Sequence, residues 1–203
     1  MPSIGSTLQS RYRIDQRAGS GGMGTVYRAT HLALGTQVAV KELHTLSNDP
    51  AIQAKFKQQF AIEAKILASL SHPNLVKVLD FFEQDGSQYI VMEYAPGKTL
   101  HEYVQAGAFR DESSALRIFA ALLDALEYLH AQSPPVILRD LKPDNIIVSN
   151  DGSVRVIDFG IAKWQLPGQI THTAAHGAGS DGFSPLEQYG GSTDTRSDLY
   201  SLG

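Results

Sequence analysis

A short hairpin in the second half of the chain gathers side chains that carry oxygen ligands. Residues 146–148 and 154–157 are β-like and flank Asp151-Gly152, a dipeptide typical of tight hairpin turns. Pairing about the centre of this turn predicts Asn145 opposite Asp158, because one precedes the turn by as many residues as the other follows it. Cross-strand neighbours lie about 5 Å apart. An amide oxygen and a carboxylate at that distance suit Mg²⁺ that also carries phosphate oxygens.

The loop before this hairpin carries a further carboxylate. Asp140 lies five residues before Asn145, within residues 138–143. It is therefore predicted to lie beside the metal, as a base or as a group that orients a hydroxyl. The alternative is a loop rich in Asp and Asn that makes local turns. That alternative is favoured for any one of these residues, but not for all of them in register.

A lysine and a glutamate form a second candidate pair. Lys41 ends a strand-like run, and Glu63 lies within the apolar stripe of a predicted helix, three residues after Phe60 and four before Leu67. A charge at such a position is unfavourable unless it is paired. Lys41 is the predicted partner, although a solvated strand end explains Lys41 alone equally well.

A glycine-rich run precedes both features. Glycines allow the backbone to approach a phosphate closely, but a flexible hairpin tip has the same composition. A dinucleotide-binding fold would require a helix directly after the glycines. Residues 25–27 instead continue as a β-like run, which argues against that fold. The run consists of Gly19, Ser20, Gly21, Gly22, Met23 and Gly24.

These residues must be positioned by two different halves of the chain. Residues 1–11 are expected to be a loose tail, and β-like runs follow at 12–14, 25–27 and 37–40. Asp49-Pro50 predicts a helix start, which 72–74 ends, before β-like runs at 75–82 and 89–92. A connector at 93–98 leads to an apolar helix over 114–130. A mostly β half thus precedes a more helical half, and a cleft between them is the expected place for a ligand.

Composition excludes several classes of protein. The 203 residues are 42% hydrophobic and 19% charged, which is typical of a globular domain. The net charge is −4 with scattered basic residues, so no nucleic-acid or membrane-surface partner is expected. The absence of cysteine removes disulfides and thiolate metal sites and fits a reducing compartment. We expect no signal peptide and no bilayer-spanning segment in this chain.

Taken in order, these motifs resemble the Hanks-type (eukaryotic-like) bacterial serine/threonine protein kinases, over about residues 12–203. The resemblance implies an α+β, bilobal fold: an antiparallel β-sheet N-lobe with one helix (12–92), a hinge (93–98) and a mainly helical, incomplete C-lobe (99–203). It implies transfer of the γ-phosphoryl group of ATP to Ser or Thr hydroxyls of a protein substrate. Mg²⁺, with Mn²⁺ as an alternative, would be the metal. It also implies a cytoplasmic domain and a transient kinase–kinase dimer, and it leaves a membrane tether after residue 203 open.

The resemblance assigns roles residue by residue. Lys41, held by Glu63, would contact the α- and β-phosphates. Asp140 would orient the substrate hydroxyl and Lys142 would steady the γ-phosphate, while Asn145 and Asp158 would hold Mg²⁺. The implied nucleotide site comprises Gly19, Ser20, Gly21, Gly22, Met23, Gly24, Val26, Ala39, Lys41, Met92, Glu93, Ala95 and Ile147. Among these, Val26, Ala39 and Ile147 would enclose the adenine, Glu93 and Ala95 would bond it through their backbones, and Met92 would be the gatekeeper.

Three departures from the family pattern qualify these expectations. Leu138 replaces the usual histidine before Arg139-Asp140, and the Ala-Pro-Glu segment is present only as Pro185-Leu186-Glu187. The chain stops shortly after Asp198, whose helix would run through the centre of the helical lobe and which would bond the catalytic loop backbone. We therefore expect the 203-residue chain alone to be a weak enzyme.

Two other functions are alternatives to an active protein kinase. A nucleotide-binding pseudokinase or inactive truncated fragment is the main alternative, and a small-molecule phosphotransferase is disfavoured because such enzymes lack the Asp-Leu-Lys-Pro loop found at 140–143. A zinc site at His172 and His176 is disfavoured because glycines follow and no further ligand joins them. Thr171 and Thr173 are candidate phosphorylation sites whose phosphate Arg139 could bind; that they are ordinary loop residues is an equally favoured alternative.

Overall fold

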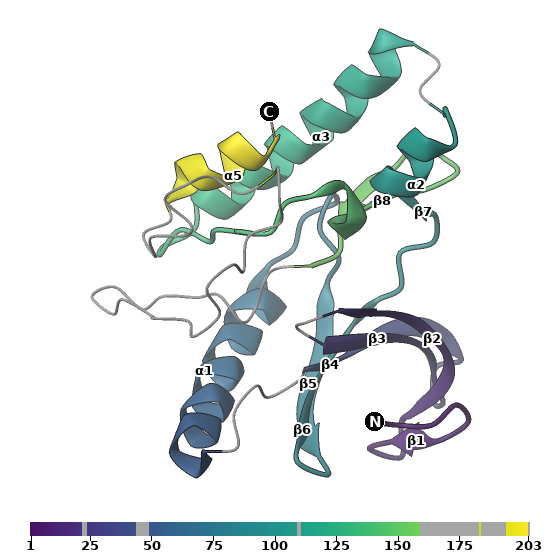
Figure 1. Cartoon of the computed structure of the whole chain (residues 1–203), viewed down its shortest axis with the longest axis vertical. Coiled ribbons are helices and arrows are strands. Elements are labelled where there is room, and N and C mark those ends of the chain that lie inside the picture. The colour runs from purple at the N-terminus through teal and green to yellow at the C-terminus, as the bar shows by residue number, and fades with distance from the viewer. Residues whose placement is uncertain (22–23, 44–48, 109–110, 159–182, 184–193, 203) are drawn as a thin grey trace. The chain divides into compact units, whose positions relative to one another are not determined.

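The computed structural model describes the chain except for residues 22–23, 44–48, 109–110, 159–182, 184–193 and 203 (Figure 1). It divides into two compact units. The first unit comprises Met1–Ser71 with Val76–Tyr94, and the second comprises His72–Leu75 with Ala95–Gly203.

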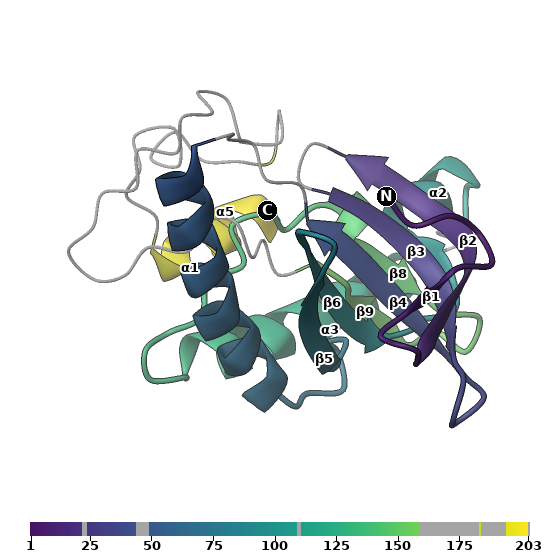
Figure 2. The ribbon, with the colours of Figure 1, turned by 90° about the horizontal axis from the view of Figure 1, so that it is seen from below.

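The first unit is built on one antiparallel sheet. Its strand order is β1-β2-β3-β4-β6-β5, and Figure 2 shows β2, β3 and β4 side by side. The predicted runs at 12–14, 25–27 and 37–40 are each part of a longer strand. The strands are β1 (Thr7–Leu8), β2 (Tyr12–Gly21), β3 (Gly24–His31), β4 (Thr36–Leu43), β5 (Val78–Gln84) and β6 (Ser87–Glu93).

Alternation along the strands gives the sheet one apolar face. Side chains at every second position share a face, and the even-numbered residues Val38 and Val40 of β4 are buried there. A hydrophobic core cluster of the first unit lies on this face and contains Leu8, Tyr12, Ile14, Tyr27, Ala29, Val38, Val40, Tyr89 and Val91.

Helix α1 (Pro50–Ser69) begins where its capping sequence predicts. It packs against β5 of the sheet. The Asp49 carboxylate accepts a hydrogen bond from the N–H of Ala51, and Pro50 occupies the first turn. Phe60 and Leu67 are buried. The Phe60 ring meets Phe81 of β5 edge-on, with ring centroids 6.2 Å apart.

The N-terminal residues are not the loose tail that was expected. β1 pairs with β2, and the N–H of Gly5 donates to the carbonyl oxygen of Ile14 at 2.8 Å. Leu8 is 3% exposed and belongs to the core. Burial of Leu8 and backbone pairing with β2 together order this segment, and composition alone reveals neither.

The second unit combines short strands with helices. The sheet order is β7-β8-β9. Among the described residues, no helix of either unit is long and apolar enough to cross a membrane. The elements are β7 (Lys98–Thr99), α2 (Leu100–Gln105), α3 (Glu112–His130), a 3₁₀ turn η1 (Pro143–Asn145), β8 (Ile146–Val148), β9 (Val154–Val156) and α5 (Thr195–Leu202).

The helices of this unit begin where side chains cap them. α3 begins two residues before the predicted position 114, because Asp111 accepts a hydrogen bond from the N–H of Ser114 at 2.7 Å. α2 was not predicted. Its signal is a capping box, in which Thr99 and Glu102 each accept the other's backbone N–H.

Candidate active site

The sheet of the first unit brings together four residues of the predicted nucleotide site. In the strand register Lys41 lies opposite Val26 on one side, and Ala39 lies opposite Met92 on the other. Lys41 and Ala39 are two residues apart in β4, so all four side chains share one face. This face is opposite to the apolar core of Val38 and Val40.

Lys41 and Glu63 are both buried within this unit, at 5% and 4% exposure. The amide nitrogen of Gln59 donates to Oε1 of Glu63 at 2.9 Å, one turn earlier in α1. Burial of an amine and a carboxylate in one unit agrees with the predicted pair, because either charge alone would be costly there. The ion pair itself stays a prediction.

The glycine-rich segment is a β-hairpin, as the strand-like run after it predicted. Gly19 pairs with Val26, Ser20 with Thr25 and Gly21 with Gly24. Gly24 has a steric reason to lack a side chain. A Cβ atom there would lie 2.2 Å from the carbonyl oxygen of Glu42 in β4, so only glycine lets the two backbones approach this closely.

Glu93 closes β6 and already uses its backbone donor. Its N–H donates to the carbonyl oxygen of Lys77 at 2.9 Å. A contribution of Glu93 to adenine binding would therefore come from its carbonyl oxygen. Ala95 belongs to the second unit, as does Ile147, which lies in β8 opposite Thr99 and Arg155.

The second unit assembles the polar residues predicted to act on the phosphoryl group. Asn145 donates from Nδ2 to the backbone oxygen of Asp140 at 2.8 Å and to its Oδ2 at 3.0 Å. Nζ of Lys142 lies 3.1 Å from the same Oδ2. Asp140 is 7% exposed and Asn145 is 8% exposed. The three predicted residues 140, 142 and 145 thus form one cluster.

Asn145 is the residue of this cluster that can offer an oxygen ligand to a bound Mg²⁺. Both donations from Nδ2 go to Asp140, so the amide oxygen Oδ1 is the atom of Asn145 left to coordinate a cation. Among the described residues, no three His, Cys, Asp or Glu side chains gather as a metal site. Two protein ligands suffice for Mg²⁺, which keeps water and phosphate oxygens around it.

The register of the hairpin differs by one residue from the prediction. Ile146 pairs with Val156 and Val148 with Val154, so Asn145 lies opposite Ile157. The N–H of Ile157 donates to the carbonyl oxygen of Asn145 at 2.9 Å. Asp158 is one position further along. The prediction assumes a two-residue turn, but Gly152 has φ +82° and its N–H donates to the carbonyl oxygen of Ser149. A three-residue loop of this kind shifts the pairing by one. That Asn145 and Asp158 share a metal stays a prediction.

A buried carboxylate binds the backbone of the loop directly before Asp140. Asp198 of α5 is 0% exposed and accepts the N–H of Leu138 at 2.9 Å and that of Arg139 at 2.8 Å. This confirms the contact that the resemblance implied. Arg139 adopts φ +60°, a region that non-glycine residues occupy only when their surroundings hold them there. The two hydrogen bonds to Asp198 supply that constraint directly before Asp140.

Two residues of this framework were missed in the sequence. His130 brings Nε2 to 2.9 Å from Oδ2 of Asp198, and it extends the buried stripe of α3 by four residues from Leu126. Asn74 was interpreted only as a helix stop. Its Nδ2 donates to the carbonyl oxygen of Val154, and its own carbonyl accepts the N–H of Val156. These bonds keep residues 74–75 beside β9, so β5 begins at Val78 rather than at 75.

Several predicted positions lie outside the described residues. They are Gly22, Met23, Thr171, His172, Thr173, His176, Pro185, Leu186 and Glu187.

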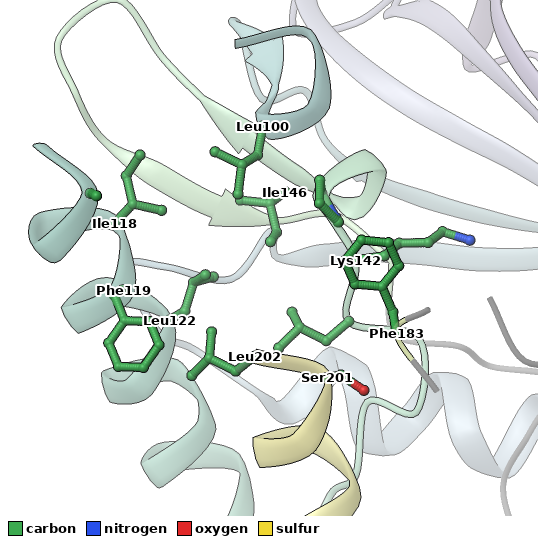
Figure 3. Close-up of a pocket in the computed structure, with 12 residues that line it drawn as sticks. Leu100, Ile118, Phe119, Leu122, Lys142, Ile146, Phe183, Ser201 and Leu202 are labelled. Carbon is green, nitrogen blue, oxygen red and sulfur yellow. The ribbon is translucent and has the colours of Figure 1, made fainter. Parts of the chain in front are cut away.

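A cavity of about 200 Å³ lies within the second unit next to the catalytic loop (Figure 3). Its wall is almost entirely apolar, and Figure 3 shows the amino end of Lys142 pointing away from Leu122 and Leu202. Of the predicted site residues it contains only Lys142, so it is not the predicted ATP site. The lining is Leu100, Ala115, Ile118, Phe119, Leu122, Leu141, Lys142, Pro143, Ile146, Phe183, Ser201 and Leu202.

Comparison with known proteins decides the family. The family model described as "Protein kinase domain" matches residues 12–203. The chain belongs to the protein kinase domain family. This kinase domain is 42% identical over 201 residues to a probable serine/threonine-protein kinase of Clostridium perfringens, and 38% identical over 200 residues to serine/threonine-protein kinase PrkC of Bacillus subtilis. Each alignment covers 98% of this chain but only 28% and 30% of the respective relative.

Solved structures agree with the predicted fold class. The PknI kinase domain of Mycobacterium tuberculosis matches with a TM-score of 0.72 and 27% identity, over 100% of this chain and 74% of that one. The apo form of PpkA-294 matches with a TM-score of 0.78 and 28% identity, over 100% and 75%. The α+β kinase fold and the family predicted from the motifs are thereby confirmed.

Proposed function

We propose that this kinase domain transfers the γ-phosphoryl group of ATP to serine or threonine hydroxyls of a protein substrate. The observation that carries the proposal is the cluster of Asp140, Lys142 and Asn145, held on a loop whose backbone is bonded to buried Asp198. Phosphoryl transfer needs little covalent chemistry from the protein. It needs positioned charges around the phosphate and an oriented hydroxyl.

Each residue then has one task. Asp140 accepts a hydrogen bond from the substrate hydroxyl and receives its proton as the oxygen attacks the γ-phosphorus. The bond from that phosphorus to the bridging oxygen breaks, and ADP leaves. Lys142, now 3.1 Å from Asp140, offsets negative charge on the transferred group. Bound Mg²⁺ would neutralise phosphate charge, with Asn145 and Asp158 as its ligands.

Residues of the first unit would bind the nucleotide. Lys41, Val26, Ala39 and Met92 share one face of the sheet, which supports their assignment to the adenine and phosphates. A serine or threonine acceptor is supported by Lys142 in the loop and by the similarity to relatives named as serine/threonine-protein kinases.

Four finer assignments follow from the resemblance. They are the lobe and hinge limits (12–92, 93–98 and 99–203), Mn²⁺ as a substitute metal, a cytoplasmic location and a transient kinase–kinase dimer. Sedimentation of the chain from low to high micromolar concentration tests the dimer, and a single monomer species throughout would contradict it.

The decisive experiment measures Mg·ATP binding and phosphotransfer together. Mg²⁺-dependent thermal stabilisation by ATP is expected in the 203-residue chain and should be lost in Asp158→Ala. Transfer of labelled phosphate to a generic protein substrate separates a kinase from the alternative, a nucleotide-binding pseudokinase or inactive fragment. Equal ATP stabilisation in Asp158→Ala would show that the metal assignment is wrong.

A further inference from the structure

A buried carboxylate lies directly after the nucleotide lysine, on the opposite face of the same strand. Glu42 is 2% exposed although Val38 and Val40, which share its face, are apolar. Oε2 of Glu42 accepts the hydroxyl of Tyr27 at 3.1 Å, and Oε1 accepts the hydroxyl of Tyr89 at 3.1 Å. The amino group of Met1 lies 3.7 Å from Oε1.

The two tyrosines tie Glu42 to the strands on both sides. Tyr27 is in β3, and Tyr89 is directly opposite Glu42 in β6. Burial, followed by the neighbouring Glu42 carboxylate, raises the pKa of Tyr89 to about 12, and the same causes raise the pKa of Tyr27. Both phenols therefore stay protonated and donate to Glu42 at neutral pH.

The network continues into the glycine-rich hairpin. Thr25 is 0% exposed and lies opposite Glu42 in the register of β3 and β4. Its side chain is hydrogen-bonded to Tyr27, and its Oγ1 lies 3.3 Å from Oγ of Ser20 across the hairpin. A continuous polar path thus runs from the hairpin through Tyr27 and Glu42 to Tyr89.

Stability alone gives a poor reason for a carboxylate at this position. A buried charge is costly, and an apolar side chain of similar volume is often equally or more stabilising. A fully satisfied polar network instead fixes one arrangement of the groups it joins. The groups joined here are the backbone of the glycine hairpin and the strand segment that carries Lys41.

We infer that Thr25, Tyr27, Glu42 and Tyr89 are positioning residues that hold the glycine hairpin and Lys41 in register for the phosphates of ATP. This inference rests on the proposed function, because it takes Lys41 and residues 19–26 as the phosphate-binding groups. Glycines allow a hairpin many conformations. An anchor at Thr25, next to Gly24 where that backbone meets the Glu42 carbonyl, restricts them.

The test compares ligands with and without phosphates. Mg·ATP and adenosine are titrated calorimetrically into the 203-residue chain and into Tyr27→Phe, Tyr89→Phe, the double variant and Glu42→Gln. The double variant removes two buried hydrogen bonds, so its affinity for Mg·ATP is expected to fall about 5–20-fold. Its affinity for adenosine, which contacts neither Lys41 nor the hairpin through phosphates, is expected to change less than about 2-fold.

Tyr12→Phe is the matched control. Tyr12 is an equally buried tyrosine of the same core, and its hydroxyl donates to a carboxylate, Asp80, at 2.8 Å. The Tyr12→Phe substitution therefore removes a hydrogen bond of the same kind, but one that does not involve β4. Tyr12→Phe is expected to leave the ratio of ATP to adenosine affinity unchanged. Equal losses for ATP and adenosine in the double variant, or the same ratio as in Tyr12→Phe, would overturn the inference.

Lys41→Ala separates this inference from the proposed function. If Lys41→Ala binds Mg·ATP as the wild type does, or if the wild type binds none, the nucleotide-site assignment fails and the inference falls with it. If Lys41→Ala weakens ATP binding while the tyrosine and Glu42→Gln variants do not, only the inference fails. Urea melts of each variant confirm that folded protein was titrated.

Discussion

The two units position their chemistry in different ways. In the first unit Lys41 lies within paired strands of eight residues each, β3 and β4, so the backbone ladder sets its place. In the second unit β8 and β9 have three residues each, and Asp140 lies in an irregular loop held by Asp198 and Asn145. The ladder distributes its constraint over many bonds, whereas the loop depends on a few side chains. Single substitutions should therefore be felt more sharply in the second unit.

The largest expected effect is the loss of phosphotransfer when Asp140 of this loop is replaced. Asp140→Asn should lower phosphotransfer by about 10²–10⁴, the usual contribution of a base or orienting group, which corresponds to about 3–5 kcal/mol of barrier. Mg·ATP affinity should remain unchanged. The measurement pairs turnover with calorimetric ATP binding in a chain that is active. Unchanged turnover would remove Asp140 from its proposed role.

Removal of the anchor should affect stability by nearly as much. Asp198→Ala leaves the N–H groups of Leu138 and Arg139 and the ring of His130 without their buried acceptor. Each unsatisfied buried donor costs about 1–3 kcal/mol, so the free energy of unfolding should fall by about 3–5 kcal/mol in urea melts.

Asp80→Ala in the first unit sharpens this comparison. Asp80 also accepts three donors, from Tyr12, Arg11 and the N–H of Phe81, but its side chain is 23% exposed. Water can replace part of what is lost, so a decrease of about 1–2 kcal/mol is expected. If both variants lose the same amount, the burial of Asp198 does not make the loop of the second unit more sensitive than the exposed position of Asp80 in the first.

The fold was predictable where the determining signal is local. Asp49-Pro50 marks the start of α1, and alternating residues mark β4, because caps and strand periodicity act over a few positions. The hairpin register was not predictable from Asp151-Gly152, because the loop length depends on the conformation that Gly152 adopts.

In the candidate site, too, contacts between residues close in sequence were predictable and contacts between distant residues were not. Asp140, Lys142 and Asn145 lie within six residues of one another, and the structure groups them as predicted. His130 and Asp198, which are in hydrogen-bond contact, lie 68 positions apart in the sequence. Glu42 and Tyr89, which are also hydrogen-bonded, lie 47 positions apart. Such contacts depend on tertiary packing, which no local pattern specifies. For Glu42 a hint existed, since strand alternation places its charge on the face of Val38 and Val40.

An alkaline titration should affect the first unit specifically. Burial and the hydrogen bond to Asp80 raise the pKa of Tyr12 from 10.0 to about 12. The folded state thus holds this proton more tightly than the unfolded state. The resulting stability is present below pH 10 and is lost as the pH rises towards 12. Tyr12→Phe should remove about 1–3 kcal/mol of this dependence, measured as a shallower decline of melting temperature between pH 9 and 11.5. Identical declines in both proteins would contradict the assignment.

The smallest effects, at the helix N-caps, should differ in where they are observed. Asp49→Ala removes the acceptor for the N–H of Ala51 in α1, and Thr99→Ala removes the acceptor for the N–H of Glu102 in α2. Loss of such a cap costs about 0.5–2 kcal/mol. α1 buries Phe60 and Leu67, so its melting is coupled to that of the sheet, and Asp49→Ala should lower the global free energy of unfolding by about 1 kcal/mol.

α2 has six residues and buries none of them, so it can fray alone. Thr99→Ala should therefore leave the urea midpoint nearly unchanged while amide exchange across 100–105 accelerates about 5-fold. An equal shift of the midpoint in both variants, without faster exchange in α2, would show that α2 unfolds only with the rest of its unit.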